Sequence, residues 1–85
     1  MRTSESGNRY TPEQTSEWIS RRMEKLGVHS YEELAEIVGI DRGTLSRYFR
    51  HERRPSIDVI APLCEVFKVS PETILIVLGA IDIKP

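Results

Sequence analysis

The sequence has little that would support a disulfide framework, a metal centre or a membrane anchor. Its 85 residues include one cysteine, Cys64, which excludes an internal disulfide and cannot alone hold zinc. The two histidines have no ligand-type partners at useful spacing, so no metal and no other cofactor is expected. The sequence has no apolar run of the roughly 18 residues needed to cross a bilayer, and its N-terminus lacks a signal-peptide pattern. These absences predict one soluble, cytoplasmic domain with no membrane partner.

Patterns that accompany catalysis are missing as well. The sequence has no nucleophile–base pattern, no glycine-rich phosphate loop and no paired carboxylates with a plausible pocket. We therefore expect that the protein is not an enzyme.

An overall excess of positive charge is also missing, because the net charge is -1 and the pI is about 6.1. The distribution of the charge is more informative than its sum. Residues 41–54 contain five arginines and two acidic residues, whereas the segments on either side are net acidic. Arginine makes forked, planar contacts with phosphate or guanine that lysine does not reproduce. The segment is therefore a candidate surface for an anionic partner.

Helix-start signals recur along the chain and predict an all-α domain of five short helices. Thr11-Pro12 precedes Gln14, Ser30 precedes Glu33, and similar starts occur at Asp41, Ser56 and Ser70. Residues 1–10 are polar and aperiodic, which predicts a mobile arm. We expect the five-helix domain to span residues 11–79, with an apolar tail at residues 80–85.

Apolar periodicity predicts which side chains face the core. In this interpretation Ile37 and Ile57 are buried, and Trp18 and Cys64 are core residues. Because adjacent helical residues diverge, either Tyr48 or Phe49 should be partly exposed. Pro62 is awkward inside a helix and predicts either a kink or a later helix start.

The spacing within residues 31–50 is the most specific signal. Two short helices that cross near a right angle need a small residue at their contact, and Ala35 supplies it. Gly39, four residues later, permits a left-handed turn, and Leu45 can bury its side chain against the first helix. Leu34, Val38 and Ile40 complete the contact. These constraints together predict a helix-turn-helix.

Residues 30–47, SYEELAEIVGIDRGTLSR, resemble the Cro/CI-type (lambda-repressor-like) helix-turn-helix family. The segments RPSID at 54–58 and FKVSPETIL at 67–75 extend the resemblance, which covers roughly residues 11–78. It implies a compact five-helix domain that binds double-stranded DNA, usually as a dimer on a palindromic operator. Most family members are transcriptional regulators, and some are antitoxins. A repressor is the expected function, and the alternative is a protein-interaction module on the same fold, such as an antitoxin or an adaptor partner.

The resemblance also implies roles for individual residues. Those expected to read bases are Arg42, Gly43, Thr44, Ser46 and Arg47. Those expected to contact phosphates are Ser30, Tyr31, Arg50, His51, Arg53 and Arg54. The sequence departs from many family members at Tyr31, where glutamine is common, and at His51, where glycine is common.

The C-terminal part has more apolar residues than one face of a short helix can use. The surplus could close the core of the same domain, or it could form a self-complementary homodimer interface. The residues predicted for such an interface are Ile76, Val77, Ala80, Ile81 and Ile83.

Overall fold

The computed structural model describes residues 9–83 and consists of five helices, with no strand in that range. The helices are α1 (Pro12–Leu26), α2 (Tyr31–Val38), α3 (Arg42–Phe49), α4 (Ile57–Phe67) and α5 (Pro71–Val77). This architecture confirms the predicted all-α fold. Within the described range, no helix combines the length and the apolar character that a membrane span requires.

Local capping determines where most of the helices begin. At α1, Thr11 Oγ1 accepts from the Gln14 backbone N–H, and the Gln14 side chain accepts from the Thr11 N–H. Side-chain oxygens at the starts of α2, α3 and α5 accept in the same way from the backbone three residues later. The helix start predicted at Ser56 is confirmed, although Ser56 makes no side-chain cap hydrogen bond.

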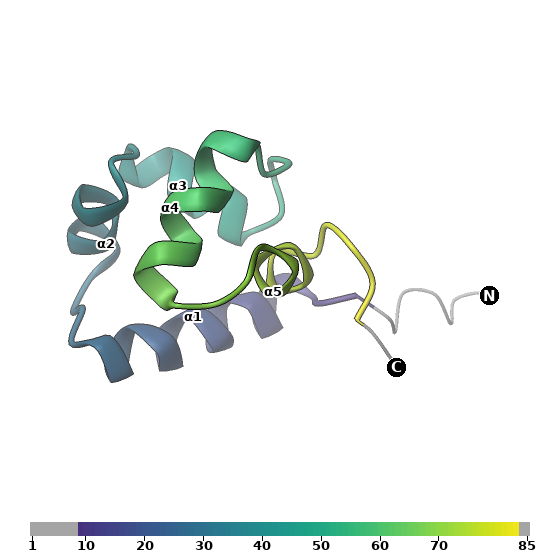
Figure 1. Cartoon of the computed structure of the whole chain (residues 1–85), viewed down its shortest axis with the longest axis horizontal. Coiled ribbons are helices and arrows are strands. Elements are labelled where there is room, and N and C mark those ends of the chain that lie inside the picture. The colour runs from purple at the N-terminus through teal and green to yellow at the C-terminus, as the bar shows by residue number, and fades with distance from the viewer. Residues whose placement is uncertain (1–8, 84–85) are drawn as a thin grey trace.

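The helices enclose one core (Figure 1). α4 packs against α1, α2 and α5, while α1 also contacts α3 and α5. The rings of Trp18 and Phe67 meet edge to face, with their centroids 5.6 Å apart, so half-buried Trp18 covers the edge of the core. The fully buried apolar side chains are Ile19, Leu34, Leu45, Leu63, Phe67, Ile74 and Val77.

Two neighbouring aromatic residues at the end of α3 correct the prediction that one of them is exposed. Tyr48 and Phe49 are both buried. α3 packs against both α1 and α2, and these two helices cover side chains that diverge from it. The Phe49 ring meets the Tyr31 ring of α2 edge to face, with 5.4 Å between centroids.

Other core predictions are also corrected. Ile37 is 53% exposed and Ile57 is 81% exposed, because no described element covers those sides of α2 and α4. Cys64 is half-buried rather than fully buried. Pro62 does not delay α4, which begins five residues earlier at Ile57. Val59, Leu63 and Phe67 bury one face of this helix on both sides of the proline, and this packing compensates for one missing backbone hydrogen bond.

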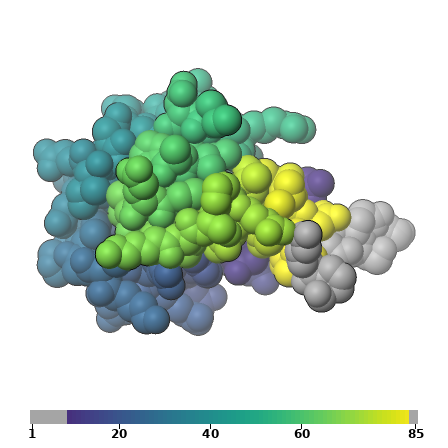
Figure 2. All heavy atoms as spheres, in the orientation of Figure 1, coloured from purple at the N-terminus to yellow at the C-terminus, as the bar shows by residue number. Residues whose placement is uncertain are grey.

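The two ends of the described chain lie side by side (Figure 2). Arg9 Nε is 2.8 Å from Asp82 Oδ1, and Ile83 lines a surface hollow together with Tyr10 and Trp18. Arg9 and Tyr10, the last residues of the predicted mobile arm, therefore contact the folded domain. The rest of that arm, residues 1–8, and residues 84–85 of the predicted tail lie outside the described residues.

The predicted dimer interface is wrong at one position. Val77 is only 1% exposed, because its side chain fills the core between helices of the same chain. Ile76, Ala80 and Ile81 are half-buried, and Ile83 is 38% exposed. Of these C-terminal residues, Val77 therefore closes the core, and the others remain partly or largely accessible at the surface.

Candidate nucleic-acid interface

α2 and α3 form the helix-turn-helix, and the turn between them depends on Gly39. This residue has a φ of 82°, in the left-handed region that glycine adopts without steric cost. The N–H groups of Gly39 and Ile40 both donate to the Ala35 carbonyl, at 2.8 and 3.0 Å. Ala35 is buried beside the turn, and Leu45 is fully buried. The three positions that predicted this motif therefore have the burial or backbone geometry that it requires.

The outer face of α3 carries the residues predicted to read bases. Arg42, Gly43 and Arg47 are exposed, whereas Thr44 and Ser46 are half-buried. Asp41 caps the helix, accepting from the Thr44 N–H at 3.1 Å and facing the Thr44 hydroxyl at 3.5 Å. The Thr44 hydroxyl is thus partly committed to the cap, so an apolar contact through its methyl group is its simplest role in a groove.

The arginines within residues 9–83 differ in the groups that their guanidinium groups contact. Arg21 pairs with Glu17 at 2.7 Å, and Arg50 pairs with Glu52 at 3.2 Å. Arg22 donates twice to the Phe67 carbonyl at the end of α4, both at 3.1 Å. Within residues 9–83, the arginines that form no ion pair and no side-chain hydrogen bond are Arg42, Arg47, Arg53 and Arg54. All of them belong to the segment that the sequence marks as basic.

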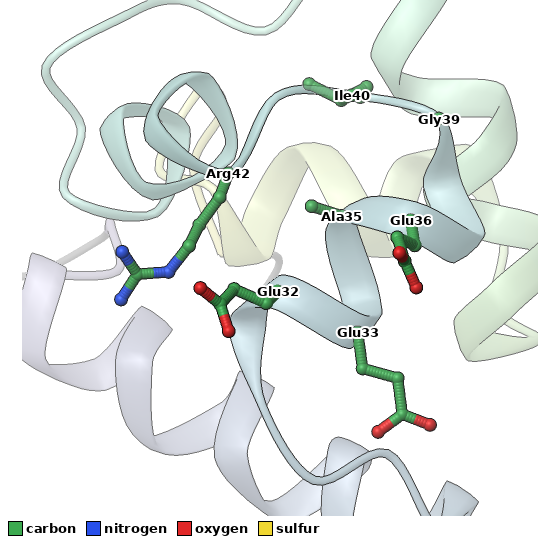
Figure 3. A pocket seen from close by; sticks show the side chains of 7 residues that line it. All are labelled: Glu32, Glu33, Ala35, Glu36, Gly39, Ile40 and Arg42. Atoms are coloured by element: carbon green, nitrogen blue, oxygen red, sulfur yellow. The ribbon is translucent and has the colours of Figure 1, made fainter.

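A surface hollow beside the start of α3 brings Arg42 close to acidic side chains of α2 (Figure 3). Glu32, Glu33 and Glu36 line this hollow, and the side chains of Arg42 and Glu32 point toward one another across it. The carboxylate of Glu32 lowers the positive potential around Arg42, although the two do not form an ion pair. Glu32 is therefore a candidate modulator of Arg42 that the family resemblance did not mark as a site residue.

The N-terminus of α2 is partly occupied by its own side chains. Ser30 Oγ accepts from the Glu33 N–H, so its lone pairs are only partly available to another donor. Glu33 Oε1 accepts from the His29 N–H at 2.9 Å, so Ser30 and Glu33 start the helix as predicted but do not form the reciprocal pair of hydrogen bonds seen at Thr11 and Gln14. The backbone N–H groups of Tyr31 and Glu32, in the first turn of α2, have no partner within their own helix and are the remaining candidates for a phosphate contact.

The comparison with protein families agrees with this geometry. A family model described as helix-turn-helix matches residues 19–74, which include α2, α3 and α4 in full. The chain belongs to the Cro/CI-type helix-turn-helix family. Members of this family are DNA-binding regulators and not enzymes, and the match assigns a DNA-binding helix-turn-helix to this chain. Neither the curated proteins nor the solved structures contain a match.

In this helix-turn-helix protein, the position of His51 corrects its predicted role as a phosphate contact. Its Nε2 lies 2.7 Å from Thr15 Oγ1, and the Thr15 hydroxyl in turn donates to the Val77 carbonyl at the end of α5. Because Thr15 uses its only proton on Val77, the His51 Nε2 must donate, which fixes the neutral tautomer with a bare Nδ1. His51 therefore joins α1 to the end of α5.

The protonation of His51 is linked to folding. Burial lowers its pKa below the ordinary value of 6.5, and the nearby Glu13 carboxylate only partly opposes this effect. The unfolded chain therefore binds a proton at a higher pH than the folded protein. This contribution to the free energy of unfolding is complete above about pH 6.5 and decreases as the pH falls through the lowered pKa.

Proposed function

We propose that the protein is a sequence-specific regulator that occupies an operator and represses transcription. The observation that carries this proposal is the position of the arginines that form neither an ion pair nor a side-chain hydrogen bond within residues 9–83, all of which lie on α3 or in the loop that follows it. Exposed guanidinium groups without local partners are available for charge-assisted contacts with phosphates and base edges. The proposal implies that the protein works in the cytoplasm, in contact with the DNA.

In the proposed complex, α3 enters the major groove. Arg42 and Arg47 read guanines, each contributing about 1 to 3 kcal/mol of discrimination if the contact is bidentate. Gly43 permits close approach of the backbone, while Thr44 and Ser46 contribute smaller contacts. This set is the predicted one, unchanged.

The proposed phosphate contacts come from the edges of the motif. Arg53 and Arg54 contact the backbone directly, and Arg50 does so after releasing Glu52. Around the start of α2, the contributors are Ser30 and Tyr31, chiefly through backbone N–H groups. His51 is no longer in this set, because its ring nitrogen is committed to Thr15.

We further propose that two copies bind one palindromic operator. The candidate interface now comprises Ile76, Ala80, Ile81 and Ile83, because Val77 belongs to the core. A stoichiometry of two chains per operator at saturation would support this arrangement, whereas one chain per operator would contradict it.

The first test is fluorescence anisotropy with labelled mixed-sequence duplex DNA, repeated at several salt concentrations. Binding should decrease steeply between about 50 and 200 mM salt, because it depends on released counterions. Arg53→Gln should weaken binding to all sequences and lower the salt slope by about one. Arg21→Gln is the matched control, because Arg21 is exposed on α1 and already paired with Glu17.

The second step uses an operator selected from a random library. Arg47→Ala should weaken operator binding by about 1 to 3 kcal/mol and relax the preference at one base pair, without altering the helical circular dichroism. An absence of binding near 50 mM salt, where phosphate contacts are strong, would contradict the DNA proposal. It would favour the protein-interaction module instead.

A further inference from the structure

A pocket of about 370 Å³ lies between the loop after α3 and the segment after α5. In Figure 2 that loop stands above the yellow C-terminal segment. The cationic side chains that line the pocket are those of Arg9, Arg53 and Arg54, and no described carboxylate lines it. Pro55 and Leu75 are among its apolar residues. A cavity with a few polar groups and apolar walls has the composition of a small-molecule site.

The wall of this pocket is fixed by tertiary contacts. His51 has a φ of 63° and is tied to Thr15, while Gly79, with a φ of 75°, lies against the imidazole ring. A Cβ atom at Gly79 would lie 2.5 Å from His51 Cε1, so only glycine leaves room for the ring in this position. The hydrogen bonds from His51 to Thr15 and on to Val77 hold the two sides of the pocket together.

The charges around the pocket are unbalanced. Arg53 and Arg54 form no ion pair within the described part of the chain, and the Arg53 guanidinium lies 6.0 Å from the centroid of the Tyr48 ring. Arg9 pairs with Asp82, but that pair is exposed and therefore easily exchanged. Guanidinium groups repel one another, and an oxyanion placed between them would relieve this repulsion while accepting forked hydrogen bonds.

We propose that this pocket binds a small organic phosphate monoester, and that the bound ligand competes with the DNA backbone for Arg53 and Arg54. A dianionic phosphate matches three guanidinium groups, and the apolar walls accommodate a short carbon skeleton. The regulatory consequence rests on the proposed function, because it requires the same two arginines to contact DNA phosphates. The ligand would then act as an inducer that releases the operator.

The site can be tested with glycerol 3-phosphate, added to the ¹⁵N-labelled chain of 85 residues against a chloride control of equal ionic strength. We expect saturable shifts of the Arg9, Arg53 and Arg54 side-chain N–H signals and of the His51 imidazole. Arg9→Gln should weaken binding about tenfold through the loss of one charge-assisted contact. Asp82→Asn should strengthen binding because it frees Arg9, and Arg21→Gln should leave it unchanged.

The second measurement is competition on the operator. Glycerol 3-phosphate should displace the wild-type protein, and Arg9→Gln should require about tenfold more ligand while keeping its affinity for DNA in the absence of ligand. Shifts that do not saturate, or that are equal in Arg9→Gln and Arg21→Gln, would overturn the site. If duplex DNA shifts the NMR signals of the pocket residues but glycerol 3-phosphate does not, the proposal that the pocket binds a free phosphate monoester is refuted. If the protein binds glycerol 3-phosphate saturably but binds no DNA, the ligand site is supported and the proposed DNA-binding function is refuted.

Discussion

Replacing Gly79 by alanine tests how firmly His51 is held in place. Gly79 has a left-handed backbone, so alanine should cost about 1 to 2 kcal/mol through its own Cβ. The added Cβ would also lie 2.5 Å from His51 Cε1 and 2.9 Å from Nδ1, so the ring must move. Moving it sacrifices the hydrogen bond to Thr15, which adds about 1 kcal/mol. The expected total loss of stability is about 2 to 3 kcal/mol.

Gly39→Ala is the matched control for this prediction. Gly39 is also left-handed, with a φ of 82°, but a Cβ there would meet nothing within 4 Å. It should therefore show only the backbone cost of about 1 to 2 kcal/mol. Urea unfolding followed by circular dichroism at pH 7 measures both variants. If Gly79→Ala destabilises the protein no more than Gly39→Ala does, the reasoning about a fixed His51 ring is refuted.

The remaining predictions concern protonation and charge. Lowering the pH from 7 to 5 should decrease the free energy of unfolding, because burial lowers the pKa of His51 and the unfolded chain takes up the proton first. In urea unfolding across this range, His51→Asn should have a flatter dependence, and an unchanged slope would argue against the linkage. Glu32→Gln should increase DNA affinity in anisotropy titrations by removing the carboxylate that faces Arg42, and an equal or weaker affinity would contradict that role.

The beginnings of the helices could be predicted because capping is a local property. Thr11, Ser30, Asp41 and Ser70 accept from backbone N–H groups three residues later, and a short stretch of sequence contains both partners. The turn at Gly39 was predictable for the same reason. The exposure of Arg42 and Arg47 on α3 was also predictable, because Leu45 occupies the opposite face of that helix.

Side-chain partners across the fold could not be predicted in this way. Periodicity places Ile37 and Ile57 on apolar faces, but it cannot show that no neighbouring element covers them. The role of His51 depends on Thr15 and Val77, which are 36 and 26 residues away from it in the chain. The proximity of Arg9 to the loop after α3 likewise depends on how the two ends of the chain meet.

The uneven distribution of arginine has a kinetic consequence. The chain carries a net charge of -1, but residues 41–54 carry an excess of positive charge, so the molecule has an electric dipole. Near a polyanion, such a dipole favours orientations that bring residues 41–54 toward the duplex before contact. More encounters with DNA therefore begin with residues 41–54 facing the duplex, and fewer begin with other faces of the protein. A small acidic protein can in this way search DNA without the indiscriminate attachment of a strongly basic one.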